Sequence, residues 1–562
     1  MSILGHHKNN KIFIFGIDGG TFDIIKPLVH RGDLPNIASL LKVGANSELA
    51  STVPPITAPA WVSFMTGKNP GKHGIFHFIG HTHDSYSGKI LSASDIKAKS
   101  LWSILSEHGK KLILINIPIT FPPKEINGIL IPGIGTPPDA QSFTYPQGIY
   151  DELLYKIGDY KVDYWDERVF NDSNPSKELI DELIENLNYM TLKRTEAALY
   201  LTKEYQWDLC MVVYVLTDRL QHLLWGLMDE RHPGHDLRLA RHFKESIWDG
   251  YKKVDEAMGT ILREIGDDVS VIVMSDHGFG PLYKSFFVNN WLLQKGFLKL
   301  RRTVPWRLQV TRPSVQRILS KLRLGFLTGF FPEKVNRFSV PKLKMVPKRW
   351  ADLIDWTKTK VYAADTLGVS INMKGREPHG IIGQGEEFEA LLQKVEEELY
   401  SLRDPETGEL VVDEVARKEK VYSGQYTGEA ADLLFAMKDL SYLPYPGRID
   451  SKMLFGKPAN NWSGTHRFNG ILILKDPRIK RDFTLSRSSI LDIAPTILYL
   501  FGLPVPKDMD GCVLGEAFFN QVLDEEPVVF SEVKNLAEGV EEDRSAKEEE
   551  QVRKHLANLG YL

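Results

Sequence analysis

The sequence has very few cysteines and no long apolar segment. Only Cys210 and Cys512 occur among the 562 residues, which argues against a disulfide framework and fits a reducing cytosol. No run of about 18 apolar residues is present, so we expect no helix that spans a membrane. The first ten residues are polar and lack the apolar segment of a signal peptide. Together these absences predict a cytoplasmic protein.

The sequence also lacks a large excess of either charge. Its 69 lysines and arginines nearly balance 73 acidic residues, for a net charge of -4. We therefore expect no general affinity for nucleic acid. With 43% hydrophobic and 25% charged residues, the chain can bury a sizeable core. This composition predicts a large soluble enzyme with a main domain and insertions.

What the sequence does contain is a set of acidic residues at the ends of apolar strands. The β-branched run 269–274 predicts a buried strand, which is followed by Asp276, His277 and a glycine-rich turn. Two similar runs lead to Asp18 and to Asp218. His222 follows Asp218 by four residues, so both side chains share one face of a helix and can reach one ion.

These carboxylates and imidazoles predict a metal site. In open parallel sheets the binding crevice lies beyond the carboxyl ends of the strands, where all three acids are expected. A single Asp-His pair is adequately explained as a turn aspartate beside a structural histidine. Three strand-end carboxylates with two imidazoles are hard to explain in that way.

Thr57 is placed where the N-cap of a helix is expected, with Pro59 in the first turn after it. The N-terminus of a helix offers unpaired N–H groups and a positive dipole end, which suit a phosphoryl oxygen. Thr57 is therefore either a simple cap or a nucleophile beside a metal, and the two roles are compatible.

These residues resemble the alkaline phosphatase superfamily, and within it the type I phosphodiesterase / nucleotide pyrophosphatase family. The segment Thr52 to Gly74 is similar to the nucleophile segment of that family, and Gly464-Thr465-His466 is similar to its last metal-ligand motif. Ser489 to Leu514 resembles the closing helix and strand of the superfamily. The motifs extend from Asp18 to Leu514 in the expected order.

The resemblance implies a fold, a ligand set and a mechanism. The fold is an α/β, doubly wound, mostly parallel sheet flanked by helices. Two divalent metal ions are implied, with Zn favoured by the mixed ligands and Mn or Fe possible. One ion would be held by Asp218, His222 and His466, and the other by Asp18, Asp276, His277 and the Thr57 oxygen. Thr57 would attack phosphorus and form a phospho-threonine intermediate.

We therefore expect a hydrolase that cleaves a phosphodiester or pyrophosphate bond in a small phosphorylated molecule. The segment Thr57-Ala58-Pro59-Ala60-Trp61 lacks the Cys/Ser-x-Pro-x-Arg pattern of sulfatases. A phosphomutase related to cofactor-independent phosphoglycerate mutase is the alternative. A non-catalytic protein that binds an anionic ligand is a weaker one, because no expected ligand is missing. No substrate-binding residue is predicted.

We predict five parts along the chain. They are the first part of the core (1–294), a basic helical cap insertion (295–350), a second α/β insertion (351–450), the second part of the core (451–530), and an acidic tail with a C-terminal helix (531–562). The basic insertion carries 15 lysines and arginines against one acid, Glu333. It is either a solvated structural cap or a surface for an anionic substrate or membrane.

Three long helices are predicted between the strands. One extends from Asn174 to Glu204, with Asn174 as its N-cap, and a second from His235 to Glu264. An acidic helix is expected from Glu386 to Leu402, within the second α/β insertion.

Overall fold

The structure is a computed structural model of the chain. It describes residues 11–82, 85–140, 143–164, 166, 168–169, 175–301, 350–364, 366, 368–446, 449, 453–458, 461–532 and 545–558. The predicted basic insertion lies largely outside these residues, because 302–349 are not among them.

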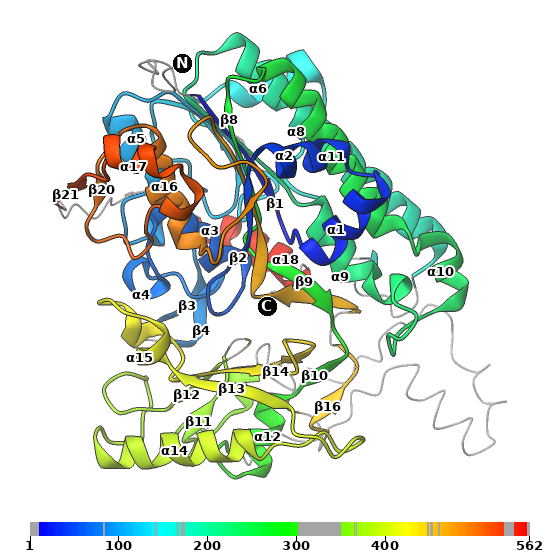
Figure 1. The fold of residues 1–562 in the computed structure, drawn as a ribbon. Coiled ribbons are helices and arrows are strands. Elements are labelled where there is room, and N and C mark those ends of the chain that lie inside the picture. The colour runs from blue at the N-terminus through cyan, green and yellow to red at the C-terminus, as the bar shows by residue number, and fades with distance from the viewer. Residues whose placement is uncertain are drawn as a thin grey trace.

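A mostly parallel sheet forms the centre of the molecule (Figure 1). Within the described residues it has eight strands, in the order β19-β2-β18-β8-β1-β7-β5-β6. From β8 to β6 all neighbours are parallel, whereas β18 is antiparallel to both β8 and β2. The strands are β1 (Ile12–Ile17), β2 (Ala45–Ala50), β5 (Leu112–Ile117), β6 (Gly128–Pro132), β7 (Leu209–Tyr214), β8 (Ser270–Met274), β18 (Asn469–Lys475) and β19 (Phe483–Thr484).

The central strands are apolar along their whole length because helices cover both faces of the sheet. One face carries α1 (Phe22–Arg31), α2 (Pro35–Val43), α6 (Ile149–Ile157), α8 (Lys177–Glu204), α9 (Leu216–Met228), α10 (Leu237–Phe243) and α11 (Ser246–Ile265). The other face carries α3 (Thr57–Thr66), α5 (Leu101–Glu107) and α16 (Ile493–Leu500). The predicted doubly wound α/β fold is confirmed.

A second hydrophobic core lies below the main sheet in Figure 1. It contains a sheet in the order β11-β12-β14-β13, with helix α14 packed against β13. Its elements are α12 (Val288–Gln294), β11 (Val361–Tyr362), β12 (Gly368–Ile371), α14 (Glu386–Tyr400), β13 (Val412–Arg417) and β14 (Leu433–Met437). The domain boundaries drawn from the sequence stay a prediction.

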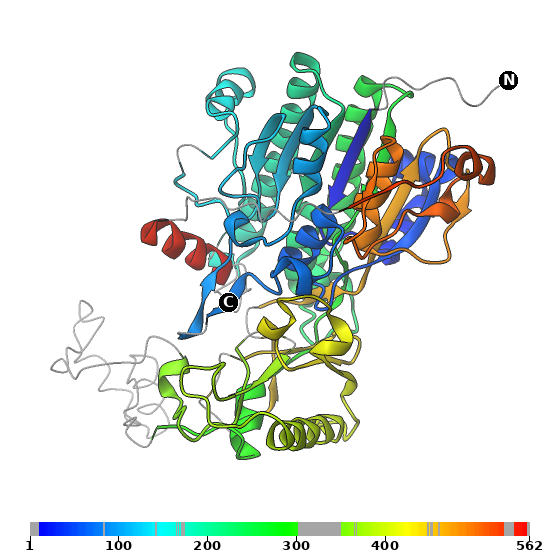
Figure 2. The ribbon, with the colours of Figure 1, turned by 90° about the vertical axis from the view of Figure 1, so that its left-hand side faces the viewer.

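Short elements connect and border these two cores. Around the main sheet they are β3 (Ile79–Thr82), β4 (Ser85–Ile90), α4 (Pro70–His73), β9 (Gly278–Pro281), β17 (Gly464–Arg467), β20 (Val505–Pro506), α17 (Asn520–Glu525) and β21 (Phe530–Ser531). Nearer the second core are β10 (Lys284–Phe286), α15 (Lys418–Val421), β15 (Tyr442–Pro444) and β16 (Phe455–Gly456). The last helix, α18 (Ala546–Asn558), packs beside the β3–β4 hairpin (Figure 2). In the part of the chain that the structure describes, no helix is long and apolar enough to cross a lipid bilayer.

All three predicted helices differ from the structure in their bounds, and α14 ends at Tyr400 rather than at Leu402. Helix α8 begins at Lys177, and its N-cap is Ser176, whose side chain accepts a hydrogen bond from the Leu179 amide. Asn174 lies outside the described residues. Serine and asparagine are equally good caps, so the sequence alone did not separate them.

The stretch predicted as one helix from residue 235 is two helices, α10 and α11. The first is capped by Asp236, and the two are separated only by Lys244 and Glu245. Both of these residues keep right-handed helical backbone angles. The apolar pattern therefore gives no sign of the break.

Candidate active site

The three predicted carboxylates meet at one edge of the central sheet. Asp18 follows β1, Asp276 follows β8, and Asp218 lies in the first turn of α9, after β7. These strands are neighbours in the order β8-β1-β7 and are mutually parallel, so their carboxyl ends face the same crevice. All three side chains are buried.

Asp218, His222 and His466 form one group. The two Nε2 atoms of the histidines are 3.0 Å apart. Asp218 Oδ1 lies 3.3 Å from His222 Nε2 and 3.5 Å from His466 Nε2. His222 stands one turn after Asp218 on α9, while β17 brings in His466 by pairing with β9.

The second group gathers around His277. Its Nε2 atom is 3.6 Å from Asp18 Oδ1, 3.2 Å from Asp276 Oδ2 and 3.4 Å from Thr57 Oγ1. Ligand atoms of Asp18, Asp218 and His277 also lie within 4.8 Å of one another. Asp218 thus lies between the two groups and belongs to both.

Backbone carbonyls orient all three imidazoles. The Nδ1 atoms of His222, His466 and His277 lie 3.0, 2.8 and 3.1 Å from the carbonyl oxygens of Gly464, Pro55 and Gly278, respectively. A carbonyl oxygen only accepts, so each Nδ1 carries the hydrogen and each Nε2 presents a lone pair to the centre. This is the arrangement of metal-binding histidines in proteins.

Each carboxylate has one oxygen that is hydrogen-bonded and one that is not. Asp18 Oδ2 accepts from Trp61 Nε1, Asp218 Oδ2 from Arg219 Nη1, and Asp276 Oδ1 from the Gly19 amide, at 3.3, 2.8 and 3.3 Å. The other three oxygens are buried and have no hydrogen-bond partner among the described residues. A buried, unsatisfied carboxylate oxygen is costly, so these atoms fit the ligand positions of cations.

Burial is the largest cause of the pKa shifts of Asp18, Asp276 and His277. Burial and the neighbouring carboxylates raise the pKa values of Asp18 and Asp276 well above their usual range. Burial would also raise the pKa of Asp218, but His222, His466 and Arg219 hold it low. Burial lowers the pKa of His277, which favours a neutral ligand. Three buried carboxylates at one site repel each other, and bound cations would remove that repulsion.

Thr57 is the first residue of helix α3, so its predicted cap position is wrong. Ile56 is the N-cap, with an extended backbone and a carbonyl that accepts from the Ala60 amide. The Oγ1 atom of Thr57 lies 3.4 Å from His277 Nε2. The hydroxyl is buried next to the predicted ligands.

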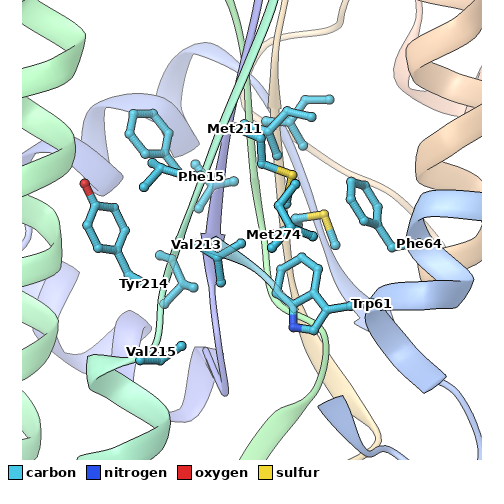
Figure 3. Close-up of a cluster of buried hydrophobic side chains, with 14 of the residues drawn as sticks. Phe15, Trp61, Phe64, Met211, Val213, Tyr214, Val215 and Met274 are labelled. Carbon is cyan, nitrogen blue, oxygen red and sulfur yellow. The ribbon is translucent and has the colours of Figure 1, made fainter. Parts of the chain in front are cut away.

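Trp61 is a site residue that the sequence did not reveal. It lies one helical turn after Thr57, and its indole N–H donates to Asp18. A Cβ at Gly16 would stand 2.8 Å from the Trp61 ring, so the glycine makes room for the indole. Figure 3 shows Trp61 packed close to Met274, Val213 and Phe64. Its spacing of four residues from Thr57 is the only signal that the sequence offered.

The chain is similar to a known protein family and to solved structures. The model of the family described as type I phosphodiesterase / nucleotide pyrophosphatase matches residues 12–451. Among curated proteins there is no match. Solved structures include human ectonucleotide pyrophosphatase / phosphodiesterase 5, at 13% identity and a TM-score of 0.46 over 92% of this chain and 99% of that chain.

Two other solved structures cover similar shares of the chain. An inactive variant of the murine ectonucleotide pyrophosphatase / phosphodiesterase 5, in complex with AMP, has 12% identity and a TM-score of 0.45 over 88% of this chain and 96% of that one. Phosphonoacetate hydrolase from Sinorhizobium meliloti, in complex with phosphonoformate, has 10% identity and a TM-score of 0.43 over 87% of this chain and 94% of that one.

Proposed function

This chain belongs to the type I phosphodiesterase / nucleotide pyrophosphatase family of hydrolases, and from that membership we propose that it cleaves a phosphodiester or pyrophosphate bond through Thr57. One observation carries the proposal. Three buried carboxylate oxygens that have no hydrogen-bond partner among the described residues converge with three imidazole Nε2 atoms beside the Thr57 hydroxyl.

Two divalent ions fit this set of ligand atoms. We assign one to Asp218, His222 and His466, and the other to Asp18, Asp276, His277 and the Thr57 oxygen. Mixed carboxylate and imidazole ligands favour zinc, with manganese or iron as alternatives. When bound, such ions supply positive charge to the attacking and leaving oxygens of a phosphoryl displacement.

The residues of the chain account for the rest of the reaction. Thr57 Oγ1 attacks phosphorus, the bond to the leaving oxygen breaks, and a phospho-threonine forms that water then hydrolyses. The amides of Thr57 and Ala58 precede the first N–H that bonds within α3, that of Ala60, and Pro59 has no N–H, so these two amides can bind the oxygens of the phosphoryl group. Trp61 keeps α3 aligned with Asp18.

The substrate we propose is a small phosphorylated molecule in the cytoplasm, where two unpaired cysteines are stable. An anionic membrane surface that binds residues 295–350 is part of the same proposal, because that stretch is strongly basic. A phosphomutase remains the second candidate, since a phosphorylated hydroxyl residue serves transfer as well as hydrolysis.

A substrate screen tests the proposal. The metal-loaded protein should release p-nitrophenol faster from bis-p-nitrophenyl phosphate than from the monoester, and should cleave nucleotide pyrophosphates. Treatment with a chelator should remove this activity, and zinc should restore it. Exchange of phosphate between hydroxyls without net release would favour the mutase. Loss of both reactions in the metal-loaded protein would contradict the proposal and favour a binding protein.

A further inference from the structure

Asp218, the carboxylate between the two groups, forms a hydrogen bond with Arg219 through the oxygen that does not face the histidines. Its Oδ1 atom faces the histidines, whereas Oδ2 accepts a hydrogen bond from Arg219 Nη1 at 2.8 Å. A carboxylate is planar, so an anchor on one oxygen fixes the direction of the other. Arg219 therefore sets where the Oδ1 atom of Asp218 points.

Arg219 lies between two carboxylates. Its Nη2 atom is 3.1 Å from Oδ2 of Asp163, which lies between α6 and α8. Only 2% of the Arg219 side chain and 9% of the Asp163 side chain are exposed. Burial would raise the pKa of Asp163, but Arg219 and His555 hold it below its usual range. The Asp163 carboxylate thus stays ionised and balances the charge of Arg219.

Asp163 is held from two directions. On one side, Arg194 of α8 donates to the carbonyls of Val162 and Val213, at 2.6 and 2.5 Å, and ties this segment to β7. On the other side, His555 of α18 places its Nε2 atom 3.0 Å from Oδ2 of Asp163. The position of Asp163 therefore depends on both the core and the C-terminal helix.

Helix α18 is firmly docked on the core. Its apolar residues Val552 and Leu556 are 1% and 0% exposed. Gln551 donates to Asp139 at 2.7 Å, and Arg553 Nη2 lies 3.4 Å from the Gly88 carbonyl in the β3–β4 hairpin. Figure 2 shows the helix next to this hairpin. The docked helix is thus able to fix the position of His555.

We propose that α18 is part of the active site, because His555 positions Asp163, Asp163 positions Arg219, and Arg219 positions Asp218 for metal binding. This inference rests on the proposed function, since it concerns the geometry of the proposed metal ligands. The three are positioning residues and touch neither substrate nor metal. They extend the site to a helix that begins more than 300 residues after Asp218 in the chain.

The test measures metal affinity as well as activity. The metal-free protein is titrated with Co²⁺, which reports its ligand geometry through its visible spectrum. Loss of a partner behind a metal ligand commonly weakens metal binding about 10- to 100-fold. We expect Asp163→Asn to raise the Kd for Co²⁺ by about this factor and to alter the spectrum. His555→Ala should act in the same direction by a smaller factor.

Glu550→Gln is the matched control, because Glu550 is exposed on the same helix, and it should leave the Kd unchanged. Unchanged Co²⁺ affinity and spectrum in Asp163→Asn and His555→Ala would overturn the inference, and a lower melting temperature of the metal-free variants would then show a purely structural role. His555 is partly exposed, so His555→Ala tests the inference on a folded chain if Asp163→Asn is unstable. A wild-type protein that neither binds Co²⁺ nor hydrolyses a diester would instead contradict the proposed function itself.

Discussion

At the scale of single residues, the site depends on which atom of each side chain faces its centre. The Nε2 atoms of three histidines and one oxygen of each aspartate face the centre. The Nδ1 atoms and the other carboxylate oxygens form hydrogen bonds with the backbone, Trp61 or Arg219. Because each candidate ligand atom is already oriented, metal binding would need little rearrangement of the chain.

Replacement of Thr57 tests the nucleophile. Thr57→Ala should lower kcat by orders of magnitude, since the attacking oxygen is lost, and should leave the fold and most of the metal in place. Thr57→Ser keeps a hydroxyl and is the control, with partial activity expected. Steady-state hydrolysis of bis-p-nitrophenyl phosphate measures both. An alanine variant that keeps more than about a tenth of the wild-type rate would exclude Thr57 as the nucleophile.

The position of Asp218 between the two groups predicts an unequal effect of ligand removal. Asp276→Asn should lower the metal content toward one ion per chain, because it affects one group only. Asp218→Asn should weaken both ions, because Asp218 contributes to both groups. Metal analysis after dialysis separates these outcomes. Equal metal loss in the two variants would show that the two groups do not act as separate sites.

The candidate ligand residues could be picked out from the sequence, whereas the residues that hydrogen-bond to them could not. Asp18 and Asp276 follow apolar strands, and a strand and an acid next to each other leave a visible pattern. Trp61 reaches Asp18 across 43 residues, and His555 reaches Asp163 across 392. Such contacts follow from the folded arrangement and leave no local pattern in one sequence.

At the scale of elements, a buried charge network holds the second core together. The Asp432 carboxylate accepts hydrogen bonds from both terminal nitrogens of Arg376, from the Lys418 ammonium and from the Ile371 amide. Burial alone would raise the pKa of Asp432, yet the neighbouring Arg376 and Lys418 hold it below its usual range. The ionised form is therefore the one that the folded protein stabilises.

Removal of this carboxylate should destabilise the protein. Arg376 keeps its ion pair with Glu377 in Asp432→Ala, but the buried Lys418 ammonium loses its carboxylate partner, which commonly costs about 3 to 5 kcal/mol. Glu389→Gln, which breaks an exposed ion pair with Arg417, is the control and should cost about 0 to 1 kcal/mol. Urea unfolding measures both. A similarly small loss of unfolding free energy in both variants would show that the network contributes little to stability.

The lowered pKa of Asp432 also has a pH consequence. Its contribution is present above the pKa of an unfolded aspartate, about 3.9, and is lost as the pH falls through the lower folded value. The wild-type protein should therefore lose more stability than Asp432→Ala below about pH 4. Parallel stability curves for the two proteins in acid would contradict this assignment.

The elements show where reasoning from sequence reaches its limit. The central strands follow from apolar runs, as the predicted strand 269–274 and the observed β8 (Ser270–Met274) show. The ends of helices were less certain, as Ser176 and the break after Phe243 show. A helix end is decided by a few hydrogen bonds, which a pattern of apolar residues does not record.

At the scale of the whole molecule, the two proposed ions should link metal binding to stability. Without cations the buried carboxylates repel one another. A metal ion that binds only the folded chain therefore stabilises it, by about 2.7 kcal/mol when the free ion is at a hundredfold excess over its Kd. Removal of metal with a chelator should lower the Tm, and zinc should restore it. The Asp218→Asn variant should respond less. A Tm that is independent of metal would argue against metal in the folded site.

The most direct test of the two-metal site is anomalous diffraction at the zinc absorption edge from crystals of the zinc-loaded protein. We predict two peaks, one beside Asp218, His222 and His466, and the other beside Asp18, Asp276 and His277. No peak within reach of Asp218, or a single peak that touches only one of the two groups, would contradict the account.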